Sequence, residues 1–251
     1  MQRFTNWTNL SEATFLLPPT QAEADYAVRI FCPGRELSFA GHPTLGSCHA
    51  WLQAGGQPKS QHIVQECGVG LVRIRRDGER LAFAAPALKK GGPLPEDDVQ
   101  LIARGLGVAR GDIVAHAWCD NGPNWRGVML QSAEQVLALK PDGAVLAGLD
   151  IGVVGARGKV GVVAPSSSNH TQFEVRAFFP GNTGMAEDPV TGSLNAALAQ
   201  WLIGQGMAPT SYVAAQGTAL GRAGRVFVQQ DGADIWIGGH SVTVIQGSVA
   251  L

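Results

Sequence analysis

The chain has 251 residues, which is enough for one large domain or two of ordinary size. With 45% hydrophobic residues, 16% charged residues and a formal net charge of -1, the composition excludes a disordered chain and argues against nucleic acid or an anionic membrane as a partner. The four cysteines show no metal-ligand spacing and no apolar export signal opens the chain, so we expect reduced thiols, no metal and a cytoplasmic protein.

The first part of the chain predicts short strands around one uncharged helix. The strands cover the stretch that ends at residue 17 and residues 26–31, 69–74 and 80–84. The helix lies between the second and third of these strands and ends at Gly55-Gly56-Gln57-Pro58, a Gly-then-Pro stop signal. The Gly- and Pro-rich stretch after Lys90 is the clearest linker, so we place a boundary there between a first lobe, residues 1–90, and a second lobe, residues 95–251.

The second part predicts three helices and a longer series of strands. The helices cover residues 96–106, residues 133–139 and a segment that begins at or just after Pro189. The strands cover residues 115–119, 125–130, 153–156, 160–164, 173–178, 225–229, 234–237 and 242–245. Each lobe is therefore interpreted as an α+β unit whose mostly antiparallel sheet curls round one helix, and the last strand is a candidate to return to the first lobe.

An internal repeat relates the two uncharged helices. The FCPG of residues 31–34 matches the FFPG of residues 178–181, and HPTLGS of residues 42–47 matches DPVTGS of residues 188–193. No Asp, Glu, Lys or Arg occurs from Pro189 to Gly221, and a helix without a polar face is expected to be wrapped by other elements. We interpret the chain as two pseudo-symmetric lobes.

The repeat places an ionisable residue, His42 or Asp188, at the start of each helix and suggests one shared cleft between the lobes. The amides of Thr191, Gly192 and Ser193 would be unpaired donors there and would form an anion site. Proton transfer needs such donors together with an acid and a base. The alternative for Asp188 is a plain helix cap, and the alternative for His42 is a histidine with a purely structural role.

Glu12 stands before an apolar strand, where a surface carboxylate is the simplest interpretation. If its side chain instead points into a closed cleft, it becomes a usable general acid/base. Ser47 and Ser193 are interpreted as hydrogen-bond donors to a substrate carboxylate rather than as nucleophiles, because neither has a base at a recognisable spacing. The remaining histidines show no ligand pairing, so no metal and no cofactor is predicted.

Five segments resemble the PhzF-like (phenazine-biosynthesis) family, over nearly the whole chain: NLSEATF, ELSFAGHPTLGS, QECGVGLV, AEDPVTGSLNAALAQWL and AAQGTALGRAGRVFV. The resemblance implies the diaminopimelate-epimerase-like fold, in which two pseudo-symmetric lobes each wrap a sheet round a central helix with the site between them. It implies a dimeric, cofactor-independent isomerase that shifts a proton on a small carboxylated metabolite. The characterised reaction of the family is the isomerisation of trans-2,3-dihydro-3-hydroxyanthranilate.

Carried over residue by residue, the resemblance implies that Glu12 is the acid/base and that His42 and Asp188 belong to the site. It also implies that Gly41, Gly192 and Ser193 contact substrate. Racemases of the wider fold use a cysteine at each helix start, where this chain has His42 and Asp188, so a two-thiol racemase is disfavoured.

Family members begin further upstream, so the first lobe is expected to lack the family's first strands. Two alternatives to the isomerase stay open at this point. One is a non-catalytic binder of small organic acids that uses the same helix ends. The other is a degenerate, truncated homologue.

Overall fold

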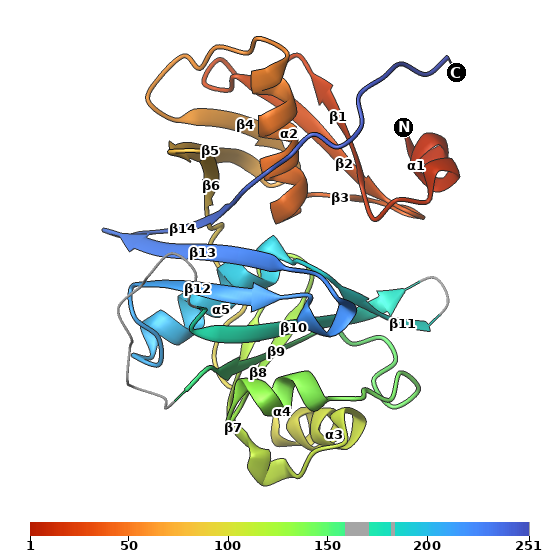
Figure 1. Ribbon diagram of the computed structural model, residues 1–251, viewed down its shortest axis with the longest axis vertical. Helices are drawn as coiled ribbons and strands as arrows, with labels where there is room; N and C mark the ends of the chain where they lie inside the picture. Colours follow the sequence, from red (N-terminus) through yellow and green to blue (C-terminus); the bar gives the residue numbers. More distant parts are fainter. Residues whose placement is uncertain (159–170, 182–183, 251) are drawn as a thin grey trace. The chain divides into compact units, whose positions relative to one another are not determined.

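The computed structural model describes residues 1–158, 171–181 and 184–250 (Figure 1). The predicted strand at 160–164 lies outside these residues. The chain divides into two compact units, one formed by Met1–Ala84 with Gly238–Leu251 and the other by Ala85–Ile237. Within the described ranges, no helix combines the length and the apolar character that a membrane crossing requires.

The first unit is a sheet that curls around one helix. Its elements are α1 (Gln2–Thr8), β1 (Ala13–Leu17), β2 (Tyr26–Cys32), β3 (Arg35–Leu37), α2 (Gly41–Gln53), β4 (Ile63–Cys67), β5 (Gly70–Asp77) and β6 (Arg80–Ala84). The strand order is β1-β2-β4-β5-β6, β3 pairs with β2, and β2 with β4 is the parallel pair. Helix α2 packs against β1 and β6, the two ends of this order, so the sheet wraps round the helix.

The second unit repeats this plan on a larger scale. Its elements are α3 (Glu96–Leu106), η1 (Arg110–Asp112), β7 (Ile113–Cys119), β8 (Trp125–Leu130), α4 (Ala133–Ala138), β9 (Ile151–Ala156), β10 (Phe173–Gly181), β11 (Gly184–Asp188), α5 (Gly192–Gly204), β12 (Ser211–Gln216), η2 (Thr218–Leu220), β13 (Gly224–Asp231) and β14 (Asp234–Gly239). The strand order is β14-β13-β12-β10-β9-β8-β7, and β11 pairs with β10. Helix α5 packs against β7 and β13, towards opposite ends of the order.

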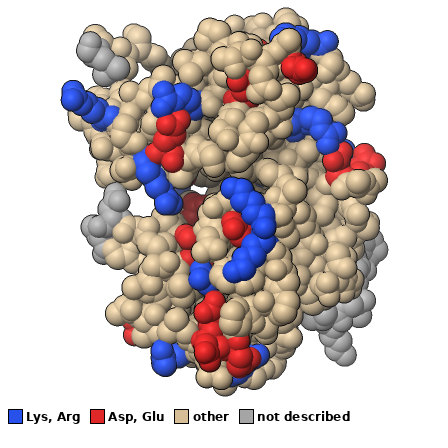
Figure 2. All heavy atoms as spheres, turned by 180° about the vertical axis from the view of Figure 1, so that it is seen from behind, with Lys and Arg blue, Asp and Glu red and all other residues tan. Residues whose placement is uncertain are grey.

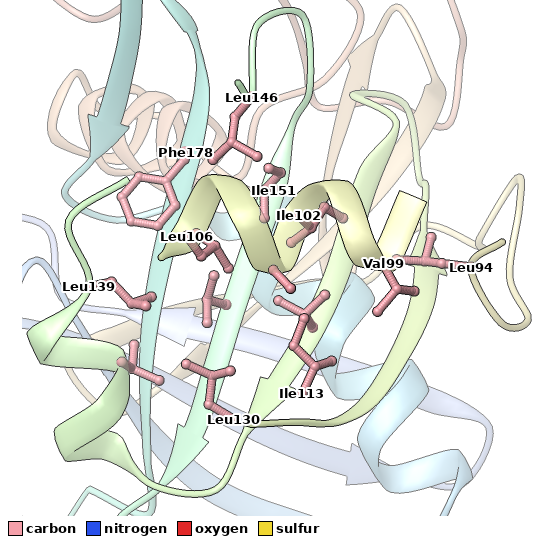
Figure 3. Packing of buried hydrophobic residues seen from close by; sticks show 14 of the residues in the cluster. Leu94, Val99, Ile102, Leu106, Ile113, Leu130, Leu139, Leu146, Ile151 and Phe178 are labelled. Carbon is pink, nitrogen blue, oxygen red and sulfur yellow. The ribbon is translucent and has the colours of Figure 1, made fainter. Parts of the chain in front are cut away.

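Both faces of the second sheet are covered. Figure 3 shows α3 lying across the strands, where Ile102 and Leu106 pack with Ile151 in a fully buried apolar cluster. Helix α4 packs on the same strands, against β8, β9 and β10. Since α5 occupies the concave face, every residue of β9 is buried, as expected for a strand covered on both sides.

The two units share one path, which confirms the predicted duplication and the α+β architecture. In each unit a strand runs antiparallel to its neighbour, turns into a short hairpin strand, continues as a 13-residue helix and returns as a parallel strand. The elements concerned are β2-β3-α2-β4 in the first unit and β10-β11-α5-β12 in the second.

The structure corrects the register of the repeat. Helices α2 and α5 begin at Gly41 and Gly192, so the counterpart of His42 is Ser193 and not Asp188. Asp188 pairs with Ala177 in the β10–β11 hairpin, as Leu37 pairs with Ile30 in the β2–β3 hairpin, so Leu37 is its counterpart. Because Asp188 still belongs to β11, the chain needs residues 189–191 to turn, and α5 starts later than Pro189 predicts.

Other expectations also change. Helix α5 is enclosed as predicted, with residues 192–199 all buried, but α2 has an exposed side that includes Gly46 and Ala50. The smaller number of strands round α2 explains the difference. Strands β4 and β12 were not predicted, and residues 242–245 form no strand. This last segment runs beside α2 instead, where the Thr243 hydroxyl donates to Gln53 Oε1 over 2.6 Å and lies 3.0 Å from His49 Nε2 (Figure 1).

Charged side chains are sparse, and many lie beside a partner of opposite sign. Figure 2 shows acidic and basic groups next to one another on the face it draws. Arg29 pairs with Glu36 at 2.7 Å, and Arg110 pairs with Glu96 at 2.8 Å. Exposed pairs of this kind contribute little to stability, so the fold depends on apolar burial.

The close approach of β9 to α5 yields a stability prediction. A Cβ atom at Gly152 would lie 2.2 Å from Cδ1 of Leu194, a side chain that is fully buried in α5. We therefore expect Gly152→Ala to lower the free energy of unfolding by about 1–3 kcal/mol, the usual cost of overpacking. Urea denaturation followed by circular dichroism measures this change.

The matched control is Gly46→Ala in α2, where a Cβ atom meets nothing within 4 Å and the residue is exposed. This change is expected to raise stability by about 0.5–1 kcal/mol, because alanine favours a helix interior. A Gly152→Ala protein as stable as the parent would show that the sheet does not need glycine at this contact.

Candidate functional site

Glu12 and His42 form a close polar pair in the first unit. Glu12 directly precedes β1, and His42 is the second residue of α2, so the packing of α2 on β1 brings the two side chains together. His42 Nε2 lies 3.0 Å from Glu12 Oε2, and the two side chains are 38% and 17% exposed. The contact is an ion pair when the imidazole is protonated and a neutral polar contact otherwise.

The Glu12 oxygen of this pair is sparingly solvated. Glu12 Oε2 is buried, and besides His42 Nε2 the described part of the chain offers it no hydrogen-bond donor. Glu12 is therefore not the solvated surface carboxylate that its sequence position also allowed.

The start of α2 carries Gly41 and His42 but not Ser47. Ala40 is the N-cap and has no side-chain hydroxyl to close the helix end. Ser47 lies beyond the first turn of α2 and is 2% exposed, and its hydroxyl has no partner within the described residues. The motif match that equated Ser47 with Ser193 is therefore wrong in position, and the substrate-binding role of Ser47 remains only a prediction.

The second candidate cluster lies where β11 leads into α5, and we call it the α5 cluster: Asp188, Thr191, Ser193 and Gln216. Thr191 Oγ1 donates to Asp188 Oδ2 over 2.6 Å. Gln216, which is fully buried in β12, accepts from the Thr191 amide over 3.0 Å and donates to Thr191 Oγ1 over 2.9 Å. Asp188 is thus not the N-cap of α5; that position belongs to Thr191.

These bonds revise the expected anion site. The Thr191 amide, predicted to be an unpaired donor, is already bound by Gln216. The amides of Gly192 and Ser193 remain in the first turn of α5, where the helix dipole favours negative charge. The anion site that the sequence predicts therefore starts one residue later along the helix.

Ser193 is oriented by two neighbours from the β7–β8 loop region. Trp125 Nε1 donates to Ser193 Oγ over 3.2 Å, and Asn121 Nδ2 donates to the Ser193 carbonyl over 2.8 Å. Because the hydroxyl oxygen accepts from the indole, its own proton is directed elsewhere. The role of Ser193 as a donor to an anionic ligand stays a prediction.

A buried ion pair holds β11 in place. Arg176 of β10 donates to Glu187 through Nε over 2.9 Å and through Nη2 over 2.7 Å. Its Nη1 also donates to the carbonyls of Val136 and Leu139 in the α4 region. The residue before Asp188 is therefore fixed by a two-point contact, which limits the movement of the hairpin end that carries Asp188.

Several of these residues were not identified from the sequence. Gln216, Trp125 and Asn121 lie far from the helix start in the chain, and no local motif marks them. Asp150 precedes β9 as Glu12 precedes β1, and the strand pairs Ile151–Phe178 and Ala13–Phe31 make the two acidic residues counterparts. The FxPG repeat aligned Phe31 with Phe178, but Glu12 lies 19 residues before Phe31 and Asp150 lies 28 residues before Phe178, so no common spacing in the sequence marks Asp150.

Cysteines do not occupy the helix starts. The N-caps of α2 and α5 are Ala40 and Thr191. Cys48 and Cys119 are completely buried, and burial raises the pKa of each thiol to about 12. In the described ranges, no three His, Cys, Asp or Glu side chains come together as a metal site requires.

Comparison with known proteins places this geometry in a family. The family model described as "Phenazine biosynthesis-like protein" (PhzC-PhzF) matches residues 1–247. The chain belongs to the PhzC/PhzF family. A relative in Schizosaccharomyces pombe, "Antisense-enhancing sequence 1", is 35% identical over 98% of this chain and 87% of its own length. The trans-2,3-dihydro-3-hydroxyanthranilate isomerase of Pseudomonas aeruginosa is 31% identical over 93% of this chain and 80% of its own length.

A solved structure supports the same fold. The PhzF-family protein of Enterococcus faecalis superposes with a TM-score of 0.77 at 23% identity, covering 100% of this chain and 86% of that protein. This PhzC/PhzF chain therefore has the predicted fold of curled sheets round central helices. Its candidate site residues form two groups, Glu12 with Gly41 and His42 in the first unit and the α5 cluster with Gly192 in the second.

Thiol labelling checks the chemistry of the buried cysteines. At pH 8 we expect iodoacetamide to modify half-buried Cys32 in the native protein and to leave Cys48 and Cys119 intact, because the thiolate is the reactive form and burial disfavours it. Peptide mass spectrometry of native and unfolded samples measures the difference. If Cys48 or Cys119 were labelled as fast as Cys32, a cysteine thiol would again be a candidate for proton transfer.

Proposed function

We propose that this PhzF-family isomerase moves a proton on a small carboxylated, cyclic or unsaturated metabolite by general acid/base catalysis and without a cofactor. The observation that carries the proposal is the Glu12–His42 pair. Its buried carboxylate oxygen lies 3.0 Å from a histidine nitrogen, at the start of an uncharged helix. General acid/base residues need such placement within hydrogen-bond reach of their partners.

Glu12 takes a proton from a substrate carbon, and the electron pair of the broken C–H bond moves into the adjacent unsaturated system. The carboxylic acid then returns the proton to another carbon of that system, so the product is an isomer and Glu12 ends as a carboxylate. His42 holds the Glu12 carboxylate and orients polar groups of the substrate. No atom is gained or lost, and no oxidant or reductant is needed.

The α5 cluster supplies the groups that hold the substrate. The Ser193 hydroxyl, whose oxygen accepts from Trp125, donates to the substrate carboxylate together with the amides at the start of α5. Asp188, fixed through Thr191, orients a polar group of the same molecule. Pre-positioned donors and acceptors of this kind stabilise charge that develops during the reaction.

The names of the relatives support a proposal for the substrate class. The Pseudomonas aeruginosa relative is named for trans-2,3-dihydro-3-hydroxyanthranilate, a cyclic unsaturated carboxylate with amino and hydroxyl groups. We propose that this chain acts on molecules of that class. This compound is therefore the first probe, followed by cyclic unsaturated carboxylates that lack the amino or the hydroxyl group.

Glu12→Gln is expected to keep the fold and to lower the turnover rate by at least ~10²-fold, the usual size of a general acid/base contribution. The substitution keeps the shape of the side chain but removes the group that binds the proton. Rates are followed by ¹H NMR on the probe, and circular dichroism verifies the fold. Full turnover by this variant would remove Glu12 from the mechanism.

Solvent deuterium separates the isomerase from a mere binder of organic acids. In D₂O the isomerase is expected to incorporate deuterium at carbon positions of the bound probe. The reason is that protonated Glu12 exchanges with solvent after it has removed the substrate proton and before it returns one. The Glu12→Gln protein is the matched control and should bind the probe without exchange. Ligand line broadening with no exchange by the parent protein, across the whole set of carboxylates, would favour the binder.

A further inference from the structure

Gln216 uses its entire hydrogen-bonding capacity at the start of α5. Its Oε1 accepts from the Thr191 amide over 3.0 Å and from Asn195 Nδ2 over 2.8 Å. Its Nε2 donates to Thr191 Oγ1 over 2.9 Å and to the Asp188 carbonyl over 3.0 Å. A side-chain amide offers two lone pairs and two protons, so every one of them is engaged.

The orientation of this amide is fixed by its backbone partners. A peptide N–H can only donate, so the atom facing the Thr191 amide must be the oxygen of Gln216. A peptide carbonyl can only accept, so the atom facing the Asp188 carbonyl must be the nitrogen. The Thr191 hydroxyl oxygen therefore accepts from Gln216, and its proton points to Asp188 Oδ2, 2.6 Å away.

Thr191 gives up the usual role of an N-cap to make this contact. An N-cap hydroxyl commonly accepts from an amide in the first turn, as Ser132 does from Gln135 at the start of α4. Thr191 makes no such capping bond. Its hydroxyl instead accepts from Gln216 and donates to the Asp188 carboxylate. The Thr191 side chain therefore caps no amide in the first turn of α5.

The first unit contains the same glutamine without the acid. The helix starts Gly41 and Gly192 and the strand residues Gln65 and Gln216 are separated by the same number of residues, so a glutamine follows each helix at the same spacing. Gln65 is also fully buried and donates to Thr44 Oγ1 over 3.0 Å. The residue that corresponds to Asp188, however, is Leu37. Each unit therefore places a buried glutamine against the first turns of its helix, and in the second unit this glutamine is linked through Thr191 to a carboxylate.

We propose that Thr191 and Gln216 are positioning residues of the isomerase, which hold the Asp188 carboxylate in one orientation towards the substrate. The inference rests on the proposed function, because it takes Asp188 to orient a polar group of the substrate. Gln216 directs the Thr191 proton, and the Thr191 proton fixes Asp188 Oδ2. A charge-assisted bond of this length restricts rotation of the carboxylate.

Thr191→Val tests the link with little change in shape. The variant removes the hydroxyl donor to Asp188, and we expect kcat to fall by about 10-fold to 100-fold, the range for a lost hydrogen bond to a charged group. Thr191→Ser restores the hydroxyl and is expected to recover most of kcat. Both are measured as deuterium exchange into trans-2,3-dihydro-3-hydroxyanthranilate at varied concentration, which separates kcat from KM.

Thr44→Val in the first unit is the matched control. It likewise removes a hydroxyl that accepts a hydrogen bond from a buried glutamine and should cost a similar amount of thermal stability, yet among the described residues no side-chain hydrogen bond joins Thr44 to a candidate site residue. We expect its kcat to stay within about twofold of the parent. An equal loss of kcat in Thr44→Val and Thr191→Val would mean that both act by loosening a helix start, and would overturn the positioning role.

A double-mutant cycle with Asp188→Asn separates the two levels of the proposal. If Thr191 acts through Asp188, adding Thr191→Val to Asp188→Asn causes little further loss, because the interaction is already gone. Additive losses would overturn the inference. Full turnover by Asp188→Asn alone would instead remove Asp188 from the proposed function, and a slow Asp188→Asn with an unaffected Thr191→Val would overturn only the positioning role.

Discussion

The structure depends on pairing the polar groups at two buried helix starts. Helices α2 and α5 carry no charged side chain, and each begins against the concave side of a sheet. An unpaired polar group in such a place costs about 1–3 kcal/mol, so burial of the helices requires dedicated partners. Gln65 and Gln216, both fully buried on the strand that follows the helix, provide them. The parallel return strand is what places each glutamine there.

Once these polar groups have partners, the remaining positions of the helix start can vary between the two units. In the first unit the positions equivalent to Asp188, Thr191 and Ser193 hold Leu37, Ala40 and His42. The first helix start therefore contributes an imidazole beside Glu12, and the second contributes hydroxyls and a fixed carboxylate. The duplication supplies a common scaffold, and the chemistry comes from residues that differ between the copies.

Much of this was predictable because the signals are local. The uncharged helices, the FxPG hairpins and the resemblance to a family led to the correct fold and to Glu12, His42 and Asp188 as candidate site residues. The predicted alignment of the two repeats was wrong because their Pro-containing motifs look alike, whereas Pro43 lies inside α2 and Pro189 precedes α5. Strands β4 and β12 were missed because both are short and each contains a buried glutamine, in the middle of β4 and at the end of β12, whose partners are far away in sequence.

Three carboxylates of this chain differ in their hydrogen-bonding surroundings, and the difference bears on the role proposed for Glu12. Glu66 accepts from the Thr20 hydroxyl, the Thr20 amide and the Gln21 amide, and these hydrogen bonds lower its pKa. Glu187 is held by two nitrogens of Arg176. Glu66 and Glu187 are thus each held by several fixed donors, which suits a structural role. Glu12 instead combines a buried oxygen with His42 Nε2 at 3.0 Å, and the described part of the chain gives that oxygen no other donor. A general acid/base has to exchange a proton with its substrate, so the proposed role of Glu12 requires a carboxylate that fixed donors do not enclose, and among these three carboxylates Glu12 has such surroundings.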